Sequence, residues 1–428
     1  MIEDVDCIWS ENLLRVKAAV QNSSTWATAR TEPSYYMSVV LFVLLILIPI
    51  FATSDPRLWL YITLSALISY LIPRIKNKHA NTKFRFWLMV PFSSACVAYA
   101  AGGGKESWHK GLVTVSLLLA GLSLGSISTD SDKKRFLRSF NVIICISAII
   151  AISEFTEGKP FFAFSPLQEW SPFRASGLLG HPLILATTAS AAVAVSLIMP
   201  RIRKFPLLLS AGLPAVGAVS SVSRSLIYLL TGAVMISLFV RNSQKKSRRK
   251  TILIASIFGI FMILQSPLSA SLDHRFTNLS SAEQATRLNA PHVTNAIVTG
   301  YKQVIGGGPG YVPFALSQSP TLLRENHGYN TLDNGFLGVY ANYGALGSIG
   351  YLFAIGMLVM TLRRKDAALG QRYAAVFGLI FVLANISFEA LNWELLLFLL
   401  AWSLGAAAKT PVQPVDDVLT KRGTARVF

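Results

Sequence analysis

The sequence is poor in charge, in cysteine and in the motifs that mark many soluble enzymes. Charged residues make up 14% of its 428 residues, whereas soluble domains carry about 25%, so a soluble protein fits poorly. Its three cysteines, Cys7, Cys96 and Cys145, are not expected to form a disulfide, because none falls in a predicted external loop. The sequence has no C-x-x-C, no H-E-x-x-H and no P-loop pattern, and we expect no metal site and no cofactor.

Long apolar runs are abundant instead. Apolar residues are 52% of the chain, and runs close to the ~20 residues that cross a bilayer recur along it. The 334–360 run is long and rich in glycine, so we expect it to be tilted or broken. The fold class is therefore all-α, a polytopic integral membrane protein. We predict about 12 transmembrane helices, at 36–54, 57–73, 85–102, 108–127, 137–154, 181–199, 205–222, 225–240, 251–268, 334–360, 373–389 and 391–407.

Basic residues alternate between the predicted loops. Of the 39 lysines and arginines, 29 fall in one set of loops and 10 in the other. Under the positive-inside rule the first set is cytoplasmic, so both termini are predicted to be cytoplasmic. We expect a cytoplasmic segment at 1–34 without a cleavable signal peptide, a transmembrane domain at 35–408 and a cytoplasmic tail at 409–428. The net charge of +18 is then mainly a topological signal, and we expect no nucleic-acid partner.

Two predicted external segments are longer than turns require. Residues 155–180 are rich in Phe, Pro and Trp, which indicates either an interfacial aromatic belt or a lid over a sugar site. Residues 269–333 form one large loop, and loops of this length are usually functional. Helical spacing within it predicts a helix from Arg287 to Ile305, with Pro291 near the start, that the glycine run 306–310 ends. The glycines either cradle phosphate through backbone N–H groups or only separate helix from loop.

Five of the arginines on the side with few basic residues are candidates for a site: Arg174, Arg224, Arg275, Arg287 and Arg324. Arginine stays charged near lipid and binds phosphate oxygens through a planar fork. Each could alternatively extend to lipid headgroups. As a group, they favour an external site for a substrate that contains phosphate.

Four segments occur in an order that resembles one family. They are Gly-x-x-Gly-His-Pro at 177–182, Ser-Arg-Ser at 223–225, Arg287 ahead of the glycine run 306–310, and Asp-Asn-x-x-Leu at 333–337 followed by Gly-x-x-Gly at 344–347. Together they resemble the O-antigen ligase and polymerase superfamily, the Wzy-type polysaccharide polymerases and the O-antigen ligases. These are membrane glycosyltransferases of the GT-C-like type, and the resemblance covers about 170–360.

The resemblance implies a bacterial inner-membrane enzyme with a periplasmic active site and an undecaprenyl-pyrophosphate-linked glycan as donor. For a polymerase of O-antigen or exopolysaccharide, the acceptor is another lipid-linked repeat unit. For a ligase in lipopolysaccharide biosynthesis, the acceptor is the lipid A core. The partners are then the lipid-linked glycan and membrane lipid, and the resemblance leaves open whether a chain-length regulator binds.

Catalysis of this transfer needs positive charge on the leaving pyrophosphate and a base for the acceptor hydroxyl. We predict a donor pyrophosphate site formed by Arg224, Arg287, Arg324, Arg174, Gly308 and Gly310.

Arg224 and Arg287 are also the predicted catalytic cations. His327 or Asp333 is the predicted base, with Glu325 and His181 as further candidates. The ligases carry a histidine where this chain has Asp333, which favours the polymerase. Asp333 could instead only cap the helix that follows it.

Two other functions are compatible with many spans. A transporter or flippase would show internal repeats and charges within spans, but no repeat is visible, and Glu154, Glu389 and Glu394 lie near the outer ends of apolar runs. A structural scaffold gives no reason for the external arginines. The predicted function is therefore the glycosyltransferase.

Overall fold

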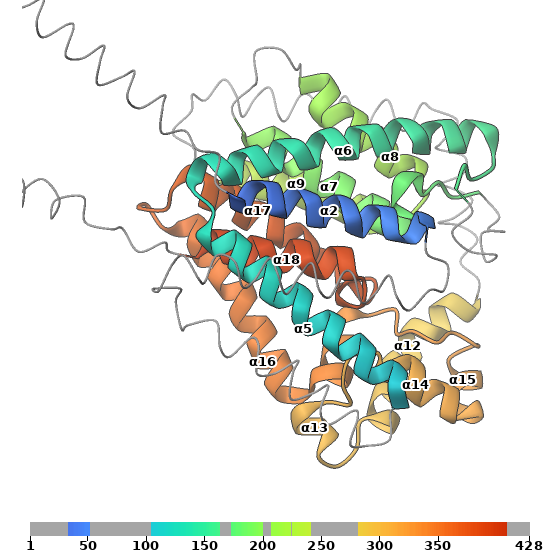
Figure 1. The fold of residues 1–428 in the computed structure, drawn as a ribbon. Helices are drawn as coiled ribbons and strands as arrows, with labels where there is room; N and C mark the ends of the chain where they lie inside the picture. Colours follow the sequence, from blue (N-terminus) through green and yellow to red (C-terminus); the bar gives the residue numbers. More distant parts are fainter. Residues whose placement is uncertain are drawn as a thin grey trace, which may run out of the picture.

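The structure, a computed structural model, describes residues 33–51, 104–162, 173–199, 207–223, 225–240 and 281–408. Over these ranges it contains thirteen α-helices, which confirms the all-α prediction for this part of the chain (Figure 1). The α-helices are α2 (Pro33–Phe51), α5 (Gly104–Ile127), α6 (Asp130–Glu157), α7 (Pro182–Ile198), α8 (Leu213–Ser220), α9 (Ser225–Phe239), α12 (Ser281–Ile297), α13 (Lys302–Ile305), α14 (Tyr311–Gln318), α15 (Pro320–Glu325), α16 (Gly335–Arg363), α17 (Leu369–Ala384) and α18 (Glu394–Ala407). Short turns of other helical types are η2 (Gly177–Leu179), η3 (Leu208–Gly212) and η4 (Ala390–Asn392).

Among the described helices, three are long and apolar enough to cross a membrane: His109–Ile127 within α5, all of α6 and all of α16. Shorter apolar helices pack beside them, including α7, α17 and α18, and α9 packs on α7 and α17. The predicted spans at 57–73, 85–102 and 251–268 lie outside the described residues.

The α6 helix begins earlier than the sequence suggested. Thr129 caps it, since its Oγ1 accepts a hydrogen bond from the backbone N–H of Asp132 at 3.2 Å. The basic residues 133–138 therefore form the first turns of a helix, which begins seven residues before the span predicted at 137–154. Gly158, with φ 69°, ends the helix at the other end.

The predicted helix from Arg287 to Ile305 is also corrected. α12 begins at Ser281, so Pro291 lies inside the helix rather than near its start. Proline has no N–H to donate to the carbonyl of Arg287 four residues earlier. Gly300, with φ 59°, then separates α12 from the short α13.

The main hydrophobic core is formed by α2, α5, α6, α7, α17 and α18, with further residues from α8, α9 and α16. The ring of Trp402 in α18 is fully buried, and its centroid lies 4.2 Å from the ring centroid of Phe136 in α6. Phe140 of α6 contacts Phe377 of α17 at 4.7 Å between ring centroids. Large aromatic side chains thus fix α6, α17 and α18 relative to one another.

Small residues bring α5 and α18 close together. Gly121 and Gly125 of α5 both face α18, and a Cβ atom on Gly121 would lie 2.7 Å from the Cβ atom of Ala401. Small residues four positions apart allow this approach of two helix backbones in a membrane. The contact aligns the first turns of α5 with the segment that precedes α18.

The α16 helix is broken, as the glycine content of 334–360 suggested. Gly344 has non-helical angles, φ 65° and ψ −165°, within the helix. α13 and the following glycines pack against this kink, where a side chain at Gly344 would collide with the backbone of Val304. A smaller core then joins α12, α14 and the start of α16, in the lower part of Figure 1, with Val293, Ile297, Val312, Leu316 and Leu332 buried in it.

The connections of the described chain gather at two ends. At one end, the backbone N–H of Gly370 donates to Asp130 at 2.6 Å, and Gln371 donates to the carbonyl of Ala408 at 2.8 Å. The segments that join α5 to α6, α16 to α17 and α18 to the tail therefore lie together.

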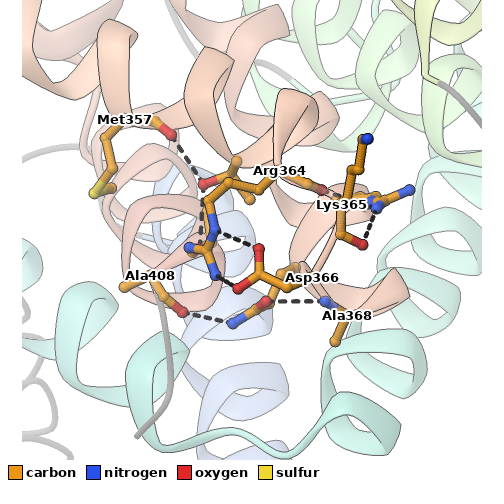
Figure 2. A network of polar contacts seen from close by, with 10 residues as sticks. Met357, Arg364, Lys365, Asp366, Ala368 and Ala408 are labelled. Atoms are coloured by element: carbon orange, nitrogen blue, oxygen red, sulfur yellow. Dashed lines mark hydrogen bonds and ion pairs between the residues drawn. The ribbon is translucent and has the colours of Figure 1, made fainter.

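The turn between α16 and α17 is ordered by its own charges, as Figure 2 shows. The guanidinium of Arg364 binds both carboxylate oxygens of Asp366, at 3.2 and 3.1 Å. Arg372 donates to the carbonyls of Arg364 and Lys365 at 2.8 and 2.9 Å. These bonds satisfy the carbonyls of the two residues that follow α16.

Candidate functional site

At the other end, α12 and the segment before α16 bring two predicted site residues together. The Nε atom of Arg287 lies 3.5 Å from Oδ2 of Asp333. The side chains are 45% and 36% exposed, so both remain accessible to a ligand. The pair joins residues 46 positions apart in the sequence, and the small core under α12 holds both segments.

Asp333 is not the cap of α16. Asn334 takes that role, since its Oδ1 accepts hydrogen bonds from the backbone N–H groups of Phe336 at 3.0 Å and Leu337 at 3.3 Å. The carboxylate of Asp333 therefore faces Arg287 rather than the helix end.

Glu389 holds the residue just before Asp333. It lies in the connection between α17, which ends at Ala384, and α18. Its carboxylate is buried, and Oε1 accepts a hydrogen bond from the backbone N–H of Leu332 at 2.8 Å. Oε2 accepts a hydrogen bond from Asn392. Gly338 of α16 leaves the room that the side chain occupies, because a Cβ atom there would lie 2.6 Å from Cγ of Glu389.

The environment of Glu389 changes its acidity. Burial raises the pKa of its carboxyl group from 4.5 to about 7, although the hydrogen bond from Leu332 and the charge of Lys110 act in the opposite direction. Asp333, by contrast, raises the pKa as a nearby like charge. The group therefore titrates near neutral pH.

Lys110 belongs to the same cluster, although sequence analysis did not assign it to a site. It lies in the first turns of α5, in electrostatic contact with Glu389 and Glu394. Its side chain also packs over Gly310, where a Cβ atom would lie 2.8 Å from Cδ of Lys110. Lys110 thus joins the glycine run to the segment before α18.

The glycine run is buried against the kink of α16. The N–H of Gly307 donates to the carbonyl of Ala341 at 2.9 Å, and the N–H of Gly308 donates to the carbonyl of Asn342 at 2.8 Å. Gly310 adopts φ 77° and precedes α14. The N–H groups of Gly307 and Gly308 are therefore already bonded to backbone carbonyls. The phosphate-binding role of Gly308 and Gly310 stays a prediction.

Arg174 lies beside the turn that contains the Ser-Arg-Ser element. Its Nε atom donates to the carbonyl of Ser221 at 3.3 Å. The segment around Arg174 is held by the buried Glu154, whose carboxylate accepts backbone N–H groups of Ser176 at 3.0 Å and Gly177 at 2.8 Å. Arg224 itself, and Arg275, lie outside the described residues.

The start of α9 connects this turn with the Arg287–Asp333 pair. Ser223 and Ser225, which flank position 224, share a hydrogen bond of 2.6 Å. One turn later, the hydroxyl of Tyr228 interacts electrostatically with both Arg287 and Asp333. The serines on either side of position 224 and the predicted catalytic pair therefore lie near the same tyrosine.

His181 caps α7 and is poorly suited to act as a base. Its Nδ1 accepts a hydrogen bond from the N–H of Leu183 at 3.2 Å. Burial, and to a lesser extent the charge of Arg174, lowers the pKa of His181 to about 3. Its ring lies 4.8 Å from the ring of Trp393, which follows η4.

The remaining candidates lie on the exposed surface after α14. His327 adopts φ 52° and is exposed, as is Arg324. Within the part of the chain that the structure describes, neither side chain forms a hydrogen bond or ion pair with Arg287 or Asp333. The Oε2 atom of Glu325 lies 3.6 Å from the Nε2 atom of His292. The geometry thus favours Asp333 over His327 as the partner of Arg287.

Three residues that order these segments were not predicted from the sequence: Glu389, Glu154 and Lys110. For the two glutamates the available signal was an acidic residue at the outer end of an apolar run, since such residues are expensive near lipid and are usually functional.

No protein-family model matches the chain, and a search of curated proteins finds no match.

Proposed function

We propose that the chain is a polytopic membrane glycosyltransferase that polymerises undecaprenyl-pyrophosphate-linked repeat units at the periplasmic face of a bacterial inner membrane. The observation that carries the proposal is the accessible Arg287–Asp333 pair beside the Ser-Arg-Ser turn. It provides a cation for a pyrophosphate and a carboxylate for a proton within one small region.

In this proposal Arg287, with Arg224, binds the donor pyrophosphate. The acceptor hydroxyl attacks the anomeric carbon of the donor sugar, and the bond from that carbon to the pyrophosphate oxygen breaks. The proton of the hydroxyl passes to Asp333, and the electron pair leaves with the pyrophosphate. Arginine stabilises the charge that accumulates on this leaving group.

The exposed surface of α16 supports a membrane location. Ile349, Leu352, Phe353 and Met360 are 60% to 66% exposed, and all are apolar. An apolar exposed surface of this kind suits lipid, and a soluble monomer rarely presents one. The periplasmic side of the site and the count of about 12 spans follow from the charge bias between loops and the apolar runs.

The test is the surface-glycan ladder of cells that lack the protein. If it is a polymerase, the ladder collapses to core plus one repeat unit, wild type restores it, and Arg287→Ala does not, because the leaving pyrophosphate loses its cation. Asp366→Asn is the matched control, since it removes a charge at the opposite end of the molecule. Long polymer made by Arg287→Ala at normal protein level would contradict the assignment.

The O-antigen ligase is the second candidate, because the same site would serve a different acceptor. A ligase deletion loses all capped core and accumulates long polymer on undecaprenyl pyrophosphate. The aspartate at position 333, where ligases carry histidine, favours the polymerase.

A further inference from the structure

Glu389 lies at the centre of a hydrogen-bond network that links four segments. Its two carboxylate oxygens accept from Leu332 and Asn392. The Oδ1 of Asn392 in turn accepts a hydrogen bond from Nδ2 of Asn342 at 3.3 Å, and the Oδ1 of Asn342 accepts from the N–H of Tyr311 at 3.1 Å. The network therefore connects the segment before α16, the segment before α18, the α16 kink and the start of α14.

We infer that Glu389 is a positioning residue, whose ionised carboxylate holds the backbone at Leu332 and thereby places Asp333 opposite Arg287. Asp333 follows directly in the chain, so any shift of Leu332 moves it. The inference rests on the roles proposed above for Asp333 and Arg287.

The ionised form fits the network better than the neutral form. An ionised carboxylate only accepts hydrogen bonds, and Glu389 receives one on each oxygen. A protonated carboxyl group must donate its O–H, so Asn392 would have to turn its amide and lose its bond with Asn342. The bond from Leu332 would also lose the strength that a charged acceptor provides.

Among the residues that the structure describes, the charged and titratable groups around Glu389 come from three elements. Lys110 of α5 and Asp333 of the segment before α16 act on it directly, and Tyr343 of α16 is affected by its charge. Lys110 favours the ionised carboxylate, whereas Asp333 opposes it. With burial added, the pKa of Glu389 lies at about 7, so the network switches between its two forms near neutral pH.

The first test measures polymer formation by the purified protein in proteoliposomes, between pH 6 and pH 8. The wild-type rate should rise about tenfold, in line with the ionised fraction of a group whose pKa is about 7. Glu389→Gln has nearly the same shape and cannot ionise, so its rate should stay close to the wild-type value at pH 6 throughout. The same pH profile for wild type and Glu389→Gln would overturn the inference.

The second test does not depend on catalysis. Amide hydrogen exchange of the peptide 329–337 is compared at one fixed pH in wild type, Glu389→Ala and Asp366→Asn. Faster exchange is expected in Glu389→Ala alone, because only this variant removes the acceptor of the Leu332 N–H. Unchanged exchange in Glu389→Ala would overturn the positioning role, even if the proposed reaction is correct. Faster exchange without any polymer from wild type would reject only the proposed reaction.

Discussion

Arg287 and Asp333 form an exposed ion pair that contributes little to stability, which suits the catalytic role that we propose for them. An ion pair this exposed, at 3.5 Å, contributes about 0–1 kcal/mol to folding. Substitution of either residue should therefore leave the protein folded and in the membrane. Loss of activity in such variants can then be attributed to the reaction itself.

The charge of Glu389, in contrast, does affect stability, because ionisation of this buried carboxyl group opposes folding. Its pKa is about 7 in the folded protein and near 4.5 when unperturbed. The folded state thus holds the proton more tightly, and the stability that this provides is complete below pH 4.5 and is lost as the pH rises through 7.

We therefore predict that the free energy of unfolding of wild type falls relative to that of Glu389→Gln, by about 1 kcal/mol, as the pH is raised from 6 to 8. The measurement is the thermal unfolding midpoint of both proteins in detergent at the two pH values, with Asp366→Asn as the exposed control. A gap between Glu389→Gln and wild type that does not change with pH would contradict the raised pKa.

Among the elements, α16 determines how the site is assembled. Its first half carries Asn334, which caps it, and Gly338, which makes room for Glu389. Its kink at Gly344 receives α13 and the glycine run. A straight helix would leave the N–H groups of Gly307 and Gly308 without the carbonyls that they bind.

Gly344→Ala should disturb both fold and activity. The residue has φ 65°, where a side chain is strained, and the new methyl group would meet backbone atoms of Val304 and Gly306. We expect a loss of about 1–3 kcal/mol in stability, measured as a lower thermal midpoint, together with less polymer.

Gly356→Ala is the matched control for that variant. It lies in the same helix, and a Cβ atom added there would have no neighbouring atom within 4 Å. Alanine in a helix is also favoured over glycine by about 0.5–1 kcal/mol. Equal effects of the two substitutions would show that the kink carries no special role.

For the whole molecule, local pattern predicted helices and one broken helix, but not the contacts that assemble the site. An apolar run lies within one helix and so predicts that helix by itself. The glycines of 334–360 likewise indicated the break that Gly344 forms. The bond between Leu332 and Glu389 joins positions 57 apart, and Lys110 reaches them from another helix. Such pairs depend on how helices pack, which sequence periodicity does not encode. The same limit explains why Pro291 was expected near the start of its helix, since α12 begins at Ser281, more than one turn before the predicted start at Arg287.

The proposed orientation can be tested with single cysteines in a chain whose native cysteines are replaced. Cysteine at position 159, an exposed site after α6, should react with an impermeant reagent in spheroplasts. Cysteine at position 365, exposed in the turn before α17, should react only after the membrane is opened. The reverse pattern would place the Arg287–Asp333 pair on the cytoplasmic side.

The central claim is that the Arg287–Asp333 site transfers glycan from a polyprenyl pyrophosphate. The most direct measurement supplies proteoliposomes of wild type, Arg287→Ala and Asp366→Asn with an undecaprenyl-pyrophosphate-linked repeat unit, and follows glycan length together with free undecaprenyl pyrophosphate. Wild type and Asp366→Asn should release one undecaprenyl pyrophosphate for each new linkage, and Arg287→Ala should release none. Movement of the lipid-linked glycan across the bilayer by wild type, without any change in its length, would contradict the account and indicate a transporter.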